Sequence, residues 1–125
     1  MITFLTLDNV IEIHQNQIFN YGGNSKLRDS GLLSSALAQP SSMFHGKYLH
    51  NNIFEMAAAY LFHIVKNHPF IDGNKRTGIV SALIFLSINK IEIETSNKEL
   101  ELMVIAVASG KMNKTEISKW FEKYS

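Results

Sequence analysis

Hydrophobic residues recur at intervals of three and four along most of this chain, which is the spacing of helices with one apolar face. The clearest run begins at Asn52 and carries Ile53, Met56, Tyr60 and Ile64. Together with start and stop signals, the pattern predicts helices over residues 6–21, 30–38, 52–67, 74–89 and 96–108, and a last helix from about residue 113.

Polar residues mark where these helices begin, because their side chains can accept hydrogen bonds from free backbone N–H groups. Thr6 or Asp8 can cap the first helix, whose apolar positions include Val10, Ile13, Ile18 and Phe19 and which Gly22-Gly23 ends. Asp29 can cap the second helix. Ser96 followed by Glu99 predicts a capping box, and Asn113 or Thr115 can open the last helix.

Residues 74–89 are apolar on nearly all sides, which predicts the core helix of a bundle. The run Ala57–Ala59 would let another helix pack closely against its own. Residues 41–50 lack periodicity and indicate an exposed loop, and residues 91–95 indicate an extended link. We therefore expect an all-α fold, a single compact bundle of about six helices that forms one domain over residues 1–125.

Composition narrows the class of protein. A chain of 125 residues that is 46% hydrophobic can form one domain with a real core. A net charge of +1 gives no global reason to expect direct nucleic-acid or membrane binding, and the absence of cysteine excludes disulfides and thiolate chemistry. The longest apolar-rich run, residues 79–88, is too short to span a bilayer, and no secretion signal is recognisable. We expect a cytoplasmic protein.

The chemistry is concentrated directly before the predicted core helix. His68 is the type of side chain best suited to accept a proton near neutral pH. Gly73 and Asn74 turn the chain into the helix, where unsatisfied N–H groups and the macrodipole favour an anion. Lys75 and Arg76 add positive charge at the same place. This layout predicts a phosphate-handling active site.

The same stretch resembles the Fic/Doc family, whose signature is His-x-Phe-x-Asp/Glu-Gly-Asn-Gly-Arg in the branch that transfers AMP and ends in Asn-Lys-Arg in the Doc branch. The matching residues here are His68, Phe70, Asp72, Asn74, Lys75 and Arg76. Residues 28–33 and 106–110 also look like this family, so that the resemblance covers nearly the full length. The fold that the family implies agrees with the helical pattern.

The resemblance to the Doc branch implies a protein kinase that uses ATP and Mg²⁺. In that interpretation His68 accepts the proton of the acceptor hydroxyl, and Asp72 holds Mg²⁺. Gly73 and Asn74 bind phosphate with the N–H groups of the turn, while Lys75 and Arg76 bind phosphate and neutralise its charge during transfer. Phe70 is expected in the core.

Two other functions stay open at this point. Lys75 stands where the AMP-transferring branch has a glycine, and its side chain would occupy space that a phosphate needs to approach the backbone there. This difference favours a kinase over an AMP transferase. A catalytically silent binding module is the other alternative, although binding alone makes no demand for this set of polar residues.

The resemblance also implies partners. The chain has no Ser/Thr-x-x-x-Glu-Gly/Asn segment of the kind that inhibits some Fic proteins, so control is expected from a separate antitoxin. The Doc branch implies elongation factor Tu as the target. Residues 41–50 are a candidate for docking the acceptor protein, because the corresponding stretch lines the active site in the family.

The remaining histidines and the C-terminal aromatic residues are expected to be structural. His14 should lie on a helix surface, and His45 and His50 in a loop. His63 lies five residues before His68, which is a poor spacing for a helical metal pair. Trp120 and Phe121 should pack in the core.

Overall fold

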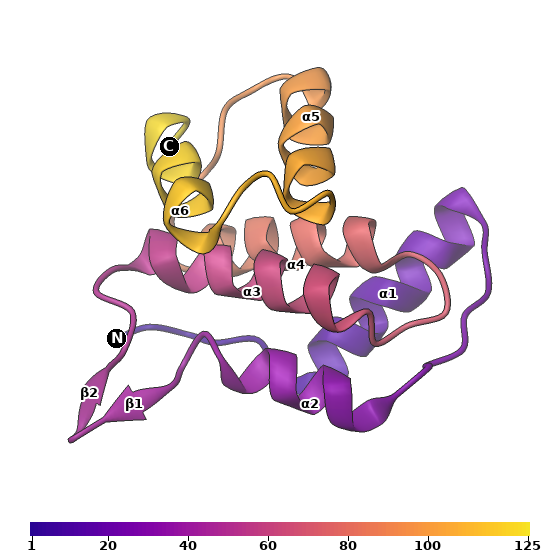
Figure 1. The fold of residues 1–125 in the computed structure, drawn as a ribbon, viewed down its shortest axis with the longest axis horizontal. Coiled ribbons are helices and arrows are strands. Elements are labelled where there is room, and N and C mark those ends of the chain that lie inside the picture. The colour runs from indigo at the N-terminus through magenta and orange to yellow at the C-terminus, as the bar shows by residue number, and fades with distance from the viewer.

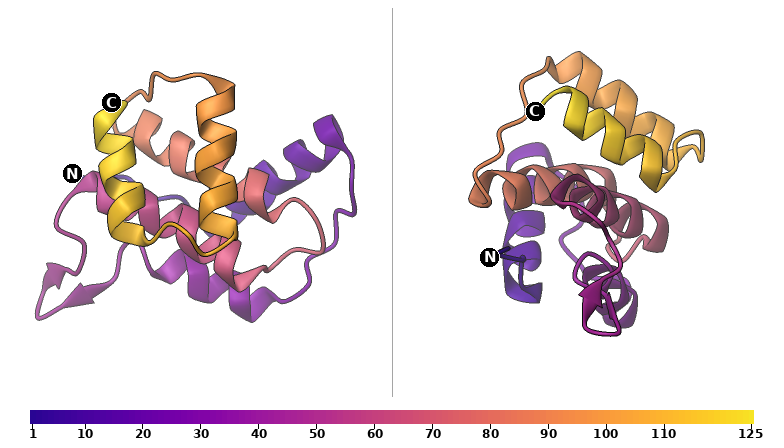
Figure 2. Two further views of the ribbon diagram at one scale, coloured as in Figure 1. Left: turned by 45° about the horizontal axis from the view of Figure 1, so that its top comes forward. Right: turned by 90° about the vertical axis from the view of Figure 1, so that its left-hand side faces the viewer.

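A computed structural model describes all residues 1–125 as six helices and one short β-ribbon (Figure 1). The elements are α1 (Leu7–Tyr21), α2 (Ser30–Ala38), β1 (Met43–Phe44), β2 (Lys47–Tyr48), α3 (Ile53–Asn67), α4 (Asn74–Ile88), α5 (Asn97–Ala108) and α6 (Lys114–Lys123). The two views of Figure 2 show α3 and α4 as a middle layer, with α5 and α6 on one side and α1 and α2 on the other. The predicted all-α fold is confirmed.

Small residues in both helices let the middle layer pack closely. Ala57, Ala58 and Ala59 of α3 are fully buried, as the sequence suggested. A Cβ at Gly78 of α4 would lie 3.2 Å from a side-chain atom of Leu61, so that glycine lets the two helices approach. One cluster of 20 buried residues draws on all six helices.

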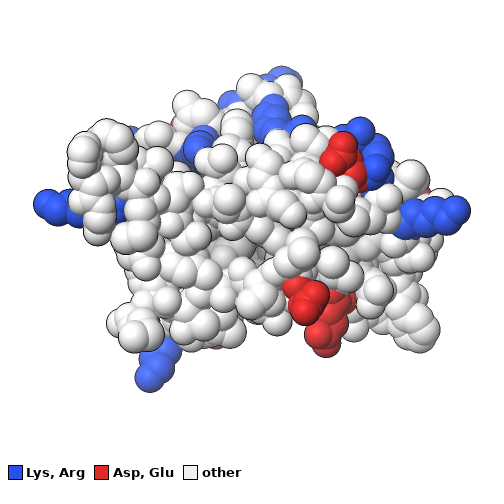
Figure 3. Space-filling model, turned by 90° about the horizontal axis from the view of Figure 1, so that it is seen from below, with Lys and Arg blue, Asp and Glu red and all other residues white.

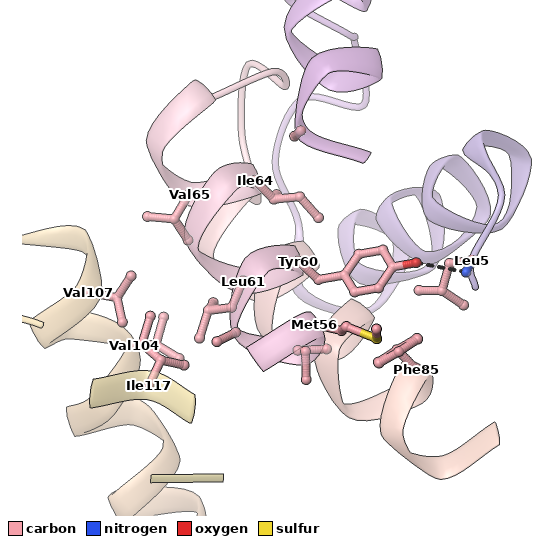
Figure 4. Close-up of a cluster of buried hydrophobic side chains, with 14 of the residues drawn as sticks. Leu5, Met56, Tyr60, Leu61, Ile64, Val65, Phe85, Val104, Val107 and Ile117 are labelled. Carbon is pink, nitrogen blue, oxygen red and sulfur yellow. Dashed lines mark hydrogen bonds between the residues drawn. The ribbon is translucent and has the colours of Figure 1, made fainter. Parts of the chain in front are cut away.

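Figure 4 shows part of this core, in which Tyr60 extends from α3 towards the N-terminal segment. Its hydroxyl oxygen accepts a hydrogen bond from the Leu5 N–H at 2.9 Å, which provides the buried polar atom with a partner. Burial raises the pKa of Tyr60 to about 12, so the hydroxyl stays neutral at physiological pH.

Most of the predicted caps are present. Thr6, Asp29 and Asn113 each accept a hydrogen bond from a backbone N–H of the first turn that follows them. Ser96 caps α5 in the same way, but Glu99 returns no bond to the Ser96 N–H, so the predicted capping box is only half formed. Phe19 was expected on the apolar side of α1 and is instead 89% exposed, because at about 100° per residue it lies on the side of the helix opposite Val10.

The predicted loop over residues 41–50 is exposed, but it contains an antiparallel ribbon that the sequence did not reveal. Its turn residues, His45 and Gly46, have φ values of 50° and 76°. Positive φ at both central positions is the requirement of the tight turns that join β-hairpins, and asparagine or glycine usually supplies the first. Each strand has only two residues, too few for an alternating pattern to show.

Residues 91–95 form the extended link that was expected, and Glu94 donates its N–H to the carbonyl of Tyr124. No helix combines the length and the apolar character needed to cross a bilayer. On the face seen in Figure 3, charged side chains are scattered among uncharged atoms, and this face carries no continuous basic surface.

Candidate functional site

The connection between α3 and α4 opens onto a pocket of about 630 Å³. The lining comes from the C-terminal ends of α1, α3 and α5, the glycine pair after α1, the connection itself and the first turn of α4. Half of the lining residues are those proposed from the sequence: His68, Asp72, Gly73, Asn74, Lys75 and Arg76. The structure thus brings every sequence-predicted site residue to one pocket.

A smaller hollow of about 380 Å³ lies between α1 and α4. Apolar and amide side chains line it, and Glu12 is its one charged residue. It contains no cation and no histidine, so it lacks the groups that would bind a phosphate or take a proton from a hydroxyl. A third hollow, of about 400 Å³ beside the hairpin, has Lys47 and His50 in its lining, but no carboxylate, and Asn52 caps the nearby helix start. Among these three hollows, the larger pocket alone combines a histidine, a carboxylate, two cations and an uncapped helix start.

His68 ends α3 in a left-handed conformation, with φ 50° and ψ 54°, and its side chain is exposed. A non-glycine residue in this conformation is uncommon and persists where surrounding contacts hold it. Arg28 supplies two of these contacts, since its Nε and Nη2 donate to the carbonyls of His68 and Asn67 at 2.7 and 2.9 Å. The candidate base is thus presented to the pocket from a fixed backbone.

The start of α4 has unsatisfied donors. Five helices have a side chain that accepts a hydrogen bond from their first turn, whereas the N-cap of α4 is Gly73, with φ 81° and no side chain to accept one. The N–H groups of Lys75 and Arg76 have no partner within the protein. Free N–H groups and the positive end of the helix dipole favour an anion in the pocket.

Asn74 holds the connection together and does not point its side chain at the pocket. It is 5% exposed, its amide nitrogen donates to the Phe70 carbonyl at 2.9 Å, and its amide oxygen accepts from the Phe70 N–H at 3.0 Å. Any contribution of Asn74 to phosphate binding is therefore left to its backbone N–H. Phe70 is buried, as expected.

Asp72 lies at the rim of the pocket with one carboxylate oxygen in use. Its Oδ2 accepts the N–H of Asn24 at 2.8 Å, and Oδ1 has no donor within the protein. No group of three or more His, Asp or Glu side chains surrounds it, so the protein alone does not build a metal cage. Mg²⁺ commonly binds through one or two carboxylates together with substrate phosphates, and a single free carboxylate oxygen beside an anion site fits that mode.

The two cations of the motif differ in their surroundings. Lys75 is exposed, and its side chain makes no hydrogen bond within the protein. The guanidinium of Arg76 lies 4.7 Å from the centre of the Tyr21 ring, where the aromatic face attracts it. Tyr21 thus restrains the guanidinium of Arg76 at the pocket, while the Lys75 side chain can move to meet an anion.

His14 was expected on a helix surface, and this prediction was wrong. The residue is 1% exposed, and its ring stacks on Phe70 with centroids 3.7 Å apart. Its Nε2 lies 2.8 Å from the Asp72 carbonyl oxygen. The signal was present in the sequence, because His14 follows Val10 and precedes Ile18 by four residues and so belongs to the apolar face of α1.

The remaining predictions about this region have mixed outcomes. Residues 41–50 contribute nothing to the pocket, and in Figures 1 and 2 the hairpin lies at the opposite end of α3. The expected role of this stretch in lining the site is therefore wrong. The His63 side chain has a partner in the protein: the Lys114 ammonium donates to its Nε2 at 3.0 Å, and burial, together with that charge, lowers the pKa of His63 to about 4.

Comparison with known proteins gives results consistent with this geometry. A relative named "Toxin Doc", from Mycolicibacterium smegmatis, is 40% identical over 58% of this chain, and the match spans 56% of that relative's length. "Protein kinase doc", from Escherichia phage P1, is 28% identical over 89% of this chain and 86% of its own length. The sequence profile described as the Fic/DOC family matches residues 4–86, which include α1 to α3, the connection and most of α4. The chain therefore belongs to the Fic/DOC family.

Proposed function

We propose that this chain is a Doc-like toxin that transfers the γ-phosphate of ATP to a hydroxyl group of another protein. The uncapped start of α4 carries this proposal, because it leaves backbone donors at the bottom of a pocket that also holds a histidine, a carboxylate and two cations. Phosphoryl transfer asks the protein mainly for positioning and for charge stabilisation, and these groups supply both.

Each residue has a defined part in this reaction. The imidazole of His68 accepts the proton as the acceptor oxygen bonds to the γ-phosphorus, and the bond between that phosphorus and the β–γ bridging oxygen breaks to release ADP. The N–H groups of Lys75 and Arg76 bind phosphate oxygens, and their side chains offset the charge. Asp72 Oδ1 would hold Mg²⁺, which when bound neutralises part of the triphosphate charge.

The choice of γ-phosphate transfer over AMP transfer rests on Lys75 and on a relative. A lysine Cβ and stem occupy the position where the AMP-transferring signature has glycine, next to the free N–H groups. The phage relative that matches most of this chain is named as a protein kinase. Both observations support the phosphoryl-transfer reaction.

The acceptor protein is expected to dock on the segment between α1 and α2, which borders the pocket. Leu27 forms an antiparallel bridge with Phe70, flanked by bonds from Ile71 N–H to the Lys26 carbonyl and from Arg28 N–H to the Pro69 carbonyl. The N–H and carbonyl of Leu27 have no partner, as expected for groups that point to the outer edge of such a ladder. An extended acceptor segment can pair there.

A Leu27→Pro protein tests this docking surface, because proline removes an N–H group that makes no hydrogen bond within the fold. We expect transfer to the acceptor protein to fall at least tenfold, while the melting temperature and the affinity for ATP stay near those of the parent. Undiminished transfer would place docking elsewhere.

Elongation factor Tu is the proposed acceptor, in line with the resemblance to the Doc branch, and it would place the chain in the cytoplasm. A separate antitoxin is the proposed source of control. Expression in bacteria with and without the neighbouring open reading frame tests this pairing. Growth arrest that this neighbour relieves and that His68→Ala abolishes is the expected result.

The reaction itself is tested with purified protein, candidate acceptor and ATP labelled at either the α or the γ position. We expect label from the γ position alone on the acceptor, and loss of labelling in a His68→Ala protein of unchanged helicity. Label from the α position would show AMP transfer instead. Undiminished γ-transfer by the variant would remove His68 as the base.

A further inference from the structure

We infer that His14 is a positioning residue of this site, which fixes the Asp72–Gly73 turn through one hydrogen bond from beneath the loop. The inference deepens the proposed function and rests on it for its catalytic consequence. Its structural content, that one donor from α1 sets the shape of the turn, stands on the contacts alone.

The His14 ring touches consecutive parts of the loop. It stacks nearly parallel on Phe70, at an interplanar angle of 7°, and its Nε2 bonds the Asp72 carbonyl at 2.8 Å. A Cβ added at Gly73 would lie 3.5 Å from ring atoms of His14, so the turn rests directly on this ring. The carbonyl can only accept, and the hydrogen therefore lies on Nε2.

Residue 72 is held from both sides by the N-terminal part of the chain. His14 binds its carbonyl, and the Asn24 N–H binds its carboxylate Oδ2. Gly23, between them in sequence, comes so close that a Cβ there would lie 3.1 Å from the Asp72 Cβ. These contacts fix both the peptide plane after Asp72, which leads into the start of α4, and the direction of the free Oδ1.

A buried histidine could serve packing alone, but the choice of partner argues for more. The Nε2–H of His14 donates to the backbone carbonyl of Asp72, which is the one carboxylate residue in the pocket lining. Without the His14 N–H, the Asp72 carbonyl would be free to rotate, and the N–H groups at the start of α4, which follow it in the chain, would be less firmly placed. Groups that orient a ligand from behind typically affect metal affinity or activity by about 10–100-fold.

Two substitutions separate the donor from the ring. His14→Phe keeps an aromatic ring to stack on Phe70 and loses the N–H. His14→Gln loses the ring and can place an amide N–H close to the position of Nε2. Tyr60→Phe is the matched control. It also removes one buried hydrogen bond between a side chain and the backbone, the bond from the Leu5 N–H to the Tyr60 hydroxyl, and Tyr60 lies two helical turns before His68. His14→Met provides a second variant without a donor, should phenylalanine not fold.

The first measurement is kcat and KM for ATP, and the Mg²⁺ concentration for half-maximal transfer, at a temperature where every variant is folded. We expect His14→Phe to lose at least tenfold in kcat/KM, His14→Gln to recover most of it, and Tyr60→Phe to lower the melting temperature with kinetics unchanged. Parent-like kinetics in His14→Phe, or no recovery by His14→Gln, would overturn the inference.

The second measurement is amide hydrogen exchange without nucleotide, and it decides the structural content even if the parent transfers no phosphate at all. We expect the N–H groups of Asn24 and Phe70 to exchange at least tenfold faster in His14→Phe than in the parent, and to be unchanged in Tyr60→Phe. Equal exchange in the parent and His14→Phe would overturn the positioning role. Absence of transfer by the parent would count against the proposed function only.

Discussion

Two histidines of this chain have the same left-handed backbone and very different surroundings. His45 in the hairpin and His68 after α3 both have φ 50°, and both are exposed. The conformation of His45 is held locally, by the tight turn between β1 and β2, each of which has two residues. Long-range contacts hold His68, through Arg28 from the segment before α2. Chemistry belongs to the second histidine because other parts of the fold bring an anion site beside it.

The two regions also differ in how firmly they are attached. The connection from His68 to Gly73 is fixed by buried side chains, chiefly His14 and Asn74. The hairpin contacts the N-terminal segment through the Phe4 and Tyr48 rings, 5.6 Å apart, and leaves Met43 and Phe44 exposed. A precisely placed site requires buried hydrogen bonds of the kind that hold the connection, whereas a surface ribbon can persist with a few contacts.

The largest effect should follow from removing the link inside the connection. Asn74→Ala leaves the N–H and carbonyl of Phe70 buried without partners, which should lower the free energy of unfolding by about 2–4 kcal/mol. Urea denaturation measures this loss. Phosphate transfer should also be abolished, because the start of α4 is no longer fixed to the loop.

Asn52→Ala is a suitable control for that experiment. Asn52 caps α3 at the hairpin end, so its loss should lower stability by about 1 kcal/mol and leave transfer unchanged. If Asn74→Ala were no less stable than Asn52→Ala, the bonds to Phe70 would not hold the connection.

A smaller effect should appear at mildly acid pH, from the two histidines near Lys114. Burial and then Lys114 lower the pKa values of both His50 and His63, that of His63 to about 4, from 6.5 in the unfolded chain. The unfolded state therefore takes up protons first, and stability falls as the pH decreases from about 6.5 towards 4.

Denaturation at a series of pH values between 4 and 7 measures this dependence. His63→Gln should flatten it, because the variant removes one of the two titrating groups beside Lys114. A slope equal to that of the parent would mean that His63 titrates alike in the folded and unfolded states.

The smallest effect should come from replacing residues 43–48 with a Gly/Ser linker. These residues form no part of the pocket, so ATP binding and transfer should stay within about twofold of the parent, with little change in melting temperature. Loss of transfer with ATP binding intact would return acceptor docking to the hairpin and would weaken the case for Leu27.

The sequence predicted the helices well because their signals are local. Apolar spacing located α3 and α4, and polar caps such as Asp29 and Asn113 fixed where α2 and α6 begin. The motif from His68 to Arg76 was recognisable for the same reason, since its residues are neighbours in the chain. Local patterns failed at the hairpin, where two-residue strands give no periodicity.

Only the tertiary structure decided which residues support the site and which part of the surface borders it. His14 and Arg28 lie far from the motif in sequence, and their side chains bind its backbone carbonyls. Asn74 belongs to the motif, yet packing turned its amide towards Phe70 and away from the pocket. Neighbouring residues establish what chemistry is available, but hydrogen bonds between distant segments form only when the core brings these segments together, and no local pattern encodes them.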